Sequence, residues 1–236
     1  FISNNGMKMV TPSETVIIMP TSGLTQDSVA STAGSYITFR NLIFDAGGYP
    51  ALSVGYAFTN GGNHIIFDSD HFRNAPYQGL QFTHYGGLNP DYNQMLNIKA
   101  YNNGRNLKTY PSGHGIYFSG KFNIVDGGEF YNNAGWGIHH YSSDQATGAG
   151  STVEDDNIIR NVKAYGNGYG TTDTGGGIVV GSGHRTLVYN NLVYDNQGGG
   201  GISQCCGAQD TVIANNVINN NGGHGIELGA KTVTVK

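Results

Sequence analysis

The sequence predicts an all-β protein whose short strands coil into stacked parallel rungs, a single-stranded β-solenoid, and three observations predict it. The chain repeats itself: TLVYNNLVYDNQGGGGISQ (186–204) precedes TVIANNVINNNGGHGIEL (211–228), and Asn196 and Asn221 align 25 residues apart. The apolar segments between Asn and Gly positions are three to five residues long and rich in Ile, Val, Tyr and Phe, which is typical of strands. Repeat periods of this size are typical of stacked architectures, so we expect about eight rungs of three strands each.

Three kinds of position recur through seven copies of the repeat. The first is an Asn two residues after an aromatic or apolar residue: Asn74, Asn103, Asn133, Asn167, Asn196 and Asn221, with Ala46 in the first copy. The second lies six residues earlier: Asn97, Asn161, Asn190 and Asn215. The third is a small residue before a branched aliphatic: Ala51-Leu52, Gly79-Leu80, Gly115-Ile116, Gly137-Ile138, Gly177-Ile178, Gly201-Ile202 and Gly225-Ile226. Since Asn and Gly tolerate left-handed backbone, we interpret the Asn columns as bends, and their side chains can hydrogen-bond between rungs.

Two further columns are predicted to support the coil rather than to bind a ligand. One is aromatic and runs over six rungs: Phe44, Phe72, Tyr101, Tyr131, Tyr165 and Tyr194. The other alternates in charge on an exposed strand: Asp70, Lys99, Glu129 and Lys163. At the spacing of paired strands, opposite charges on neighbouring rungs form a weakly stabilising surface ladder, and an ion-binding strip is the alternative.

The repeat predicts one domain over 1–236, with an irregular segment over 1–35, seven rungs over 36–230 and an unfinished rung over 231–236. A strand is expected over 13–20. Neither end carries an evident cap, and open rungs expose unpaired backbone groups. We therefore expect either further protein on both sides or end-to-end self-association.

Composition excludes several classes of function. A net charge of −4, a pI near 6.0 and the lack of a Lys/Arg cluster argue against nucleic acid as a partner. No apolar run approaches the length of a membrane span. Cys205 and Cys206 are adjacent, and a bridge between neighbours is unusual, so two unpaired thiols are expected. The alternatives are a redox switch, metal binding and intermolecular pairing.

The repeat resembles the right-handed parallel β-helix superfamily, the pectate-lyase-like fold, over about residues 36–230. Segments such as AYNNG (100–104) are similar in style to mannuronan C5-epimerases, although the Tyr-Gly-Phe-Asp-Pro-His motif of those enzymes is absent. The resemblance implies a right-handed coil, a polysaccharide partner and an extracellular, secreted location. Gly113-His114-Gly115 is similar to a polygalacturonase motif, but Gly-x-Gly-Ile is simply the repeat here. The paired carboxylates of a hydrolase are not in matching places.

Insertions in repeat proteins gather on one face and often carry function. Four long connections are expected to wall a cleft: Thr83–Asn93, Gly104–Gly115, Ser142–Asp156 and Gly168–Gly177. Its floor is predicted to be the outward residue of the third strand in each rung: Ser53, Gln81, Tyr117, His139, Val179, Ser203 and Glu227. His140, next to His139, should point inward as a core histidine.

The middle of this floor is the candidate catalytic site. His139 and Tyr117 are predicted to transfer protons, because His and Tyr can donate and accept them. Substrate contacts are predicted for Arg105, Lys108, Tyr110, His114, Gln81, His84 and Asp173, where the two cations would neutralise a carboxylate. No metal ligand set or cofactor is expected. Calcium is the alternative that the resemblance implies, although the several Asp residues on one strand face that hold it in the lyases are missing here. An ordinary polar loop face without chemistry is the alternative.

The sequence thus favours a carbohydrate-active protein, a lyase or C5-epimerase of an acidic polysaccharide. The competing interpretation is a structural, adhesive or fibre-forming β-solenoid that binds glycan or nothing. The clustered insertions favour the first, and the missing catalytic motifs favour the second. Because one scaffold hosts both kinds of protein, the fold cannot choose between them.

Overall fold

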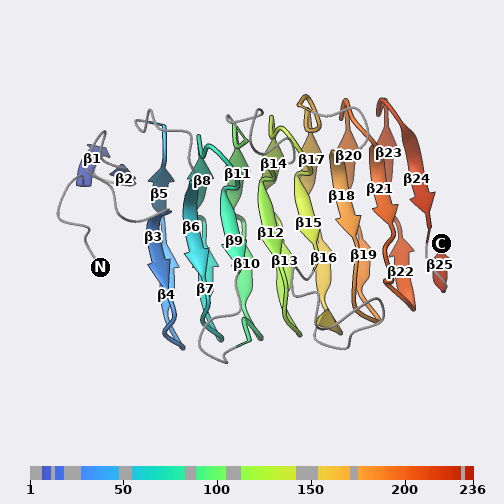
Figure 1. Cartoon of the computed structure of the whole chain (residues 1–236), viewed down its shortest axis with the longest axis horizontal. Helices are drawn as coiled ribbons and strands as arrows, with labels where there is room; N and C mark the ends of the chain where they lie inside the picture. Colours follow the sequence, from blue (N-terminus) through green and yellow to red (C-terminus); the bar gives the residue numbers. More distant parts are fainter. Residues whose placement is uncertain are drawn as a thin grey trace.

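The chain coils into a parallel β-helix, and this confirms the predicted all-β fold class. The computed structural model describes residues 7–11, 14–18, 28–47, 55–82, 89–104, 113–141, 154–170, 175–229 and 232–236. Three sheets, here named A, B and C, run along the axis of the coil, and successive rungs add one strand to each (Figure 1). The N-terminal and C-terminal strands lie at opposite ends of the coil.

Each sheet has its own set of strands. Sheet A contains β1 (Met7–Thr11), β2 (Glu14–Ile18), β5 (Leu42–Asp45), β8 (His71–Arg73), β11 (Lys99–Tyr101), β14 (Glu129–Tyr131), β17 (Lys163–Tyr165), β20 (Leu192–Tyr194) and β23 (Val217–Asn219). Sheet B contains β3 (Ser28–Thr32), β6 (Tyr56–Asn60), β9 (Leu80–Phe82), β12 (Ile116–Phe118), β15 (Ile138–His140), β18 (Gly176–Val180), β21 (Gly200–Gln204) and β24 (His224–Leu228). Sheet C contains β4 (Thr38–Arg40), β7 (Ile66–Asp68), β10 (Gln94–Leu96), β13 (Ile124–Asp126), β16 (Ile158–Arg160), β19 (Leu187–Tyr189), β22 (Thr211–Ala214) and β25 (Val233–Val235).

Pairing between rungs is parallel, as the repeat predicts. Leu187 pairs with Val212 in parallel register, so the two copies that first define the repeat lie side by side. The hairpin of β1 and β2 is antiparallel. The strand expected over 13–20 is observed as β2, and β2 and β3 already pair with the coil inside the segment 1–35.

The aromatic column predicted over six rungs is wrong in its first two members. Phe72 pairs with Ala100, whereas Arg73 is the partner of Tyr101. Phe44 and Phe72 therefore stack inside the core, with ring centroids 5.4 Å apart. The outer column contains Tyr101, Tyr131, Tyr165 and Tyr194, stacked at 4.8, 5.0 and 5.0 Å. A shift of one residue along a strand moves a side chain to the opposite face, and this explains the error.

One Asn column forms a hydrogen-bonded ladder that is buried from Asn103 to Asn196 and half-buried at Asn221. The side chains of Asn103, Asn133, Asn167, Asn196 and Asn221 bond in succession, each Nδ2 donating to the next Oδ1 at 2.8–2.9 Å. Each Nδ2 of the last four also donates to a backbone carbonyl of the preceding rung, as Asn133 does to Ala100. The rung-to-rung bonding is thus confirmed.

The left-handed bends lie beside this ladder rather than in it. Positive φ angles occur one residue earlier, at Asn102 (56°) and Asn132 (53°) for example. The second Asn column is left-handed as predicted: Asn97, Asn161, Asn190 and Asn215 have φ between 51° and 58°. Asn is the common non-glycine residue in this region, because its short side chain tolerates it.

The predicted charge ladder is also corrected. Lys99 pairs with His71 and Glu129, and Glu129 pairs with Lys163, to which it forms an ion pair of 3.4 Å. Asp70 is not on this exposed strand face. It is fully buried at the corner before β8, where its Oδ1 accepts the Leu42 N–H at 2.8 Å.

The third strand of the first repeat copy is also predicted at the wrong residues. Phe58, not Leu52, is the partner of Leu80, and Thr59 pairs with Gln81. Ala51, Leu52 and the floor residue Ser53 lie outside the described residues. The predicted pair is the first apolar pair after the bend, whereas β6, the strand that supplies the partner of Leu80, begins at Tyr56.

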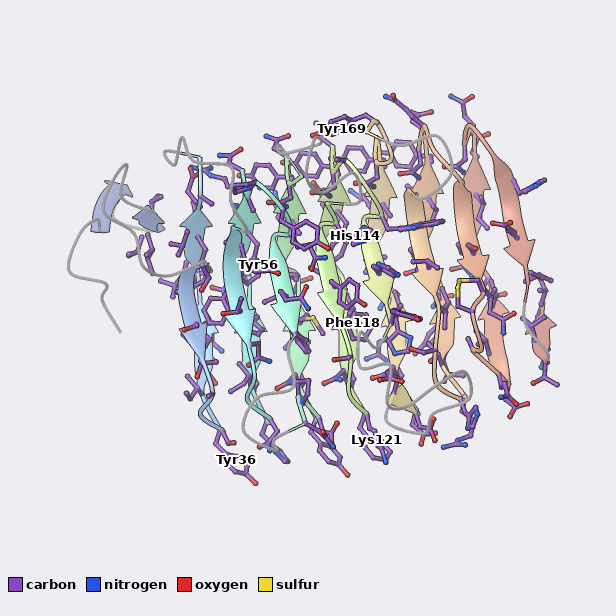
Figure 2. All side chains as sticks on the ribbon, in the orientation of Figure 1. Tyr36, Tyr56, His114, Phe118, Lys121 and Tyr169 are labelled. Atoms are coloured by element: carbon purple, nitrogen blue, oxygen red, sulfur yellow. A yellow bond between two sulfur atoms is a disulfide. The ribbon has the colours of Figure 1, made fainter. Side chains whose placement is uncertain are left out.

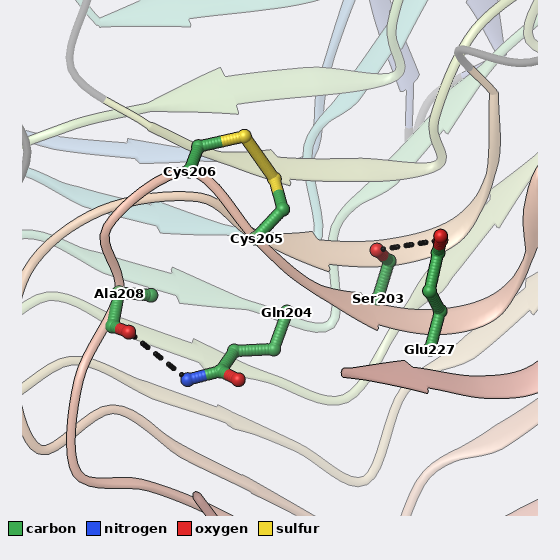
Figure 3. Close-up of a disulfide and its surroundings, with 6 residues drawn as sticks. All are labelled: Ser203, Gln204, Cys205, Cys206, Ala208 and Glu227. Atoms are coloured by element: carbon green, nitrogen blue, oxygen red, sulfur yellow. Dashed lines mark hydrogen bonds between the residues drawn. A yellow bond between two sulfur atoms is a disulfide. The ribbon is translucent and has the colours of Figure 1, made fainter. Parts of the chain in front are cut away.

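Cys205 and Cys206 form a disulfide, so the expectation of two unpaired thiols is wrong (Figure 3). The bridge directly follows β21, in a turn where the Ala208 N–H donates to the Cys205 carbonyl at 3.1 Å. Gln204 continues into the core, and its Nε2 donates to the Ala208 carbonyl at 3.1 Å.

Removing this bridge is expected to have little effect on stability. The bridge closes a loop of only two residues, so loop-closure entropy gives it about 1 kcal/mol. A Cys205→Ser/Cys206→Ser double variant should therefore lower the free energy of unfolding by about that amount in urea titrations. Mass spectrometry provides the control: the wild-type protein should take up a thiol alkylator only after reduction. Alkylation of both cysteines without a reductant would contradict the pairing.

Candidate functional site

The outer face of sheet B carries the predicted floor residues in one column. Register joins Gln81, Tyr117, His139, Val179, Ser203 and Glu227 on β9, β12, β15, β18, β21 and β24. Their strand neighbours Ile116, Phe118, Ile138 and His140 are fully buried in the core, as the alternation of a β-strand requires. The predicted direction of the third strand is therefore confirmed for these residues.

The centre of this face is outward-directed yet buried. Tyr117 is 8% exposed, and Val179 is 2% exposed. Gln81 folds back, and its Nε2 donates to the Phe82 carbonyl at 2.6 Å. A substitution here therefore removes packing as well as a functional group, unlike one on an open surface.

Two histidines are hydrogen-bonded to each other at this place. His139 Nδ1 lies 2.8 Å from His114 Nε2, and their rings meet edge to face at 4.3 Å. The other nitrogen of His114, Nδ1, accepts the Trp136 backbone N–H at 2.8 Å. His114 is 2% exposed and lies near the middle of the coil (Figure 2).

Two tyrosine rings pack against His139, and a tryptophan lies beside the neighbouring strand β18. Tyr117 meets His139 edge to face with centroids 4.7 Å apart, and Tyr141 stacks at 5.8 Å. Trp136 is 7% exposed, and a Cβ on Gly176 would come within 2.7 Å of its indole. Glycine at 176 thus leaves room for the indole.

Burial lowers the pKa of all three neighbouring histidines. It lowers the pKa of His139 to about 3, with His140 adding to the shift. It also holds the pKa of His114 well below its usual range, with His139 contributing. His140 is fully buried, its pKa is lowered to about 3, and its Nε2 lies 3.0 Å from Asn157 Nδ2. The prediction of an inward core histidine is confirmed.

The structure brings together four of the nine predicted site residues. His139, Tyr117, His114 and Gln81 share the face described above. Arg105, Lys108, Tyr110, His84 and Asp173 lie outside the described residues, as do most of the predicted walls of the cleft.

Sequence reasoning missed two residues of this site: Trp136, whose backbone N–H donates to His114, and Tyr141, which stacks on His139. Trp136 occupies the same place in the repeat as His114, namely the second residue of Gly-x-Gly-Ile. Large side chains at that variable position were a usable signal, because most other rungs have Gly or Gln there. Tyr141 lies just beyond β15, and no repeat position indicates it.

Within the described residues, no group of three or more His, Cys, Asp or Glu side chains is arranged to hold a metal ion. No helix in that part of the chain is long and apolar enough to cross a membrane.

Comparisons with known proteins agree on the fold. The family described as "Right handed beta helix region" matches residues 140–236. The A-module of the mannuronan C-5 epimerase AlgE4 of Azotobacter vinelandii is 14% identical with a TM-score of 0.56, and the match covers 84% of this chain and 54% of that one. The Dettilon tailspike protein is 15% identical at a TM-score of 0.53, covering 85% and 40%. The periplasmic alginate epimerase AlgG is 12% identical at 0.52, covering 85% and 46%.

This chain thus spans about half the length of these structures. None of the curated protein sequences matches it significantly. The coil is right-handed, as the resemblance implied.

Proposed function

We propose that this right-handed parallel β-helix protein acts on an acidic polysaccharide, as a lyase or C5-epimerase, on the outer face of sheet B. The observation that carries the proposal is the contact of Tyr117 with His139, ring to ring at 4.7 Å, on neighbouring strands of that face. Two structural neighbours whose names include mannuronan or alginate epimerase support the substrate class. A location outside the cytoplasm belongs to the same proposal.

The chemistry needs few groups. In β-elimination, a base takes the proton at C5 of the uronate, the electron pair forms the C4–C5 double bond, and the C4–O4 bond breaks as O4 gains a proton. In epimerisation, the proton leaves one face of C5 and another is delivered to the opposite face. Both reactions build negative charge on the carboxylate, which hydrogen-bond donors stabilise. We assign the proton transfer and the stabilisation of the developing charge to Tyr117 and His139 together, with Arg105 and Lys108 binding the carboxylate.

The experiment is a screen of the purified protein against polyuronates in D2O. Ultraviolet absorbance reports the unsaturated product of a lyase, and deuterium at C5 in uncleaved polymer reports an epimerase.

On a substrate found in this way, Tyr117→Phe and His139→Ala should each lower turnover about 100- to 10,000-fold. Thermal unfolding of each variant must be measured beside activity, because Tyr117 is buried and His139 is half-buried. Ser203→Ala, two strands along the same column, is the matched control and should keep activity. Full activity in both site variants would refute this site.

A non-catalytic glycan-binding or structural solenoid is the second candidate. The continuous ladders of Asn and Tyr side chains and the similarity to a tailspike support it. Retention on immobilised polyuronate without any product or deuterium exchange would favour this candidate.

A further inference from the structure

We propose that His114 is a positioning residue that holds His139 as the neutral tautomer whose Nε2–H donates a hydrogen bond to the substrate carboxylate. The inference rests on the proposed function and assigns a separate role to each residue of its site. It is carried by a chain of two hydrogen bonds that starts at a backbone amide.

The first bond determines the proton position on His114. A backbone N–H can only donate, and the Trp136 N–H points to His114 Nδ1 at 2.8 Å. That nitrogen must therefore present a lone pair, and a neutral imidazole then carries its proton on Nε2. A doubly protonated His114 would direct an N–H against the Trp136 N–H.

The second bond determines the position of the proton on His139. His114 Nε2–H donates to His139 Nδ1 at 2.8 Å, so Nδ1 of His139 also presents a lone pair. The proton of neutral His139 consequently resides on Nε2, for which the described residues provide no hydrogen-bond partner. Protonation of His139 would set two N–H groups against each other, and burial lowers its pKa to about 3 in the same direction.

This arrangement makes His139 a donor and not a base. One ring nitrogen is engaged by His114, and the other already holds a proton. A neutral imidazole N–H in a buried site can stabilise developing negative charge on a carboxylate oxygen without itself transferring a proton. Proton transfer at C5 then falls to Tyr117, the neighbouring group of the proposed pair. As a phenolate it takes the C5 proton; in elimination the phenol so formed gives that proton to O4 as the C4–O4 bond breaks, and in epimerisation water supplies the proton on the opposite face.

The test compares His114→Phe with His114→Gln. Gln offers an N–H donor of similar reach, and Phe offers none. In the wild-type protein, 15N NMR of the imidazoles should show an unprotonated Nδ1 and a protonated Nε2 for His139. His114→Phe should give a mixture of His139 tautomers and lower turnover about 10- to 100-fold, with a smaller change in KM. His114→Gln should keep most of the wild-type His139 tautomer and most of the turnover. Trp136→Phe is the matched control, since it keeps the backbone donor and should keep the tautomer.

The outcomes separate the two proposals. A protonated Nδ1 on His139 in the wild-type protein, or an unchanged tautomer in a folded His114→Phe variant, would overturn the positioning role. If the tautomer is as stated but no polyuronate is turned over or exchanged at C5, the proposed function fails, and the donation to substrate fails with it. Because melting temperature and the His114→Gln spectrum are measured as well, a variant that merely unfolds is recognised.

Discussion

Replacing Asn133 with alanine is expected to lower the free energy of unfolding by about 4 kcal/mol. Its side chain makes four hydrogen bonds of 2.9–3.2 Å: it accepts the N–H and Nδ2–H of Asn103 and donates to Ala100 O and Asn167 Oδ1. All of these groups are buried, so the partners left behind cannot turn to water, and each unmade bond costs about 1 kcal/mol. Urea unfolding followed by circular dichroism measures the loss.

The adjacent Asn132 provides the matched control. It is exposed and left-handed, with φ of 53°, and glycine adopts that conformation freely. Gly166 fills the equivalent bend in the next rung with φ of 64°. Asn132→Gly should change stability by less than about 1 kcal/mol. Equal losses in Asn132→Gly and Asn133→Ala would show that the buried ladder contributes nothing beyond chain conformation.

Replacing Asp70 with asparagine is expected to stabilise the protein by about 3 kcal/mol at pH 8, because burial raises the pKa of this carboxyl from 3.8 to about 7. Oδ1 accepts the Leu42 N–H, but the buried Oδ2 has no hydrogen-bond partner among the described residues. Asn191 occupies the same corner four rungs later. There Oδ1 accepts the Val162 N–H, and Nδ2 donates to Ile159 O. The asparagine of the Asp70→Asn variant would complete the same pair of bonds.

The pH dependence follows from the direction of the shift. Between pH 3.8 and about 7 the folded state holds the Asp70 proton that the unfolded state has lost. This contribution to stability is thus complete below 3.8 and disappears as the pH rises through 7. His139 and His140 have the opposite effect on stability. Because their pKa values are lowered from 6.5 to about 3, their contribution to stability rises as the pH increases from about 3 to 6.5.

Only the difference between variant and wild type therefore isolates Asp70. The gain from Asp70→Asn should vanish near pH 4 and grow towards pH 8. Asp68→Asn, which removes a partly exposed ion pair with Arg40, should change stability by less than about 1 kcal/mol. A gain that is the same at both pH values would show that Asp70 is already ionised in the folded protein.

The fold follows from the amino-acid repeat alone. A repeat of apolar strands and Asn bends has few ways to bury its apolar side, and stacking each copy on the next in parallel is the one observed. The ladder from Asn103 to Asn221 and the inward His140 follow from the same alignment. The copies of the repeat diverge most at Phe44, Leu52 and Asp70, and there the predicted alignment of the copies is wrong by one or more residues. Since strand faces alternate with a period of two, such a slip reverses what is inside and outside.

The candidate site, unlike the fold, follows only in part from the sequence. The sequence placed Tyr117 and His139 on one face, since strand alternation and register are regular. It did not place His114 behind His139, because that contact joins the entry of one rung to the strand of the next, and its 2.8 Å separation depends on how the turn packs. Nor did it predict the disulfide of Cys205 and Cys206, because whether neighbours can bridge depends on the turn that holds them. Periodic features are specified locally and repeat, whereas contacts between unlike turns are decided only when the chain is packed in three dimensions.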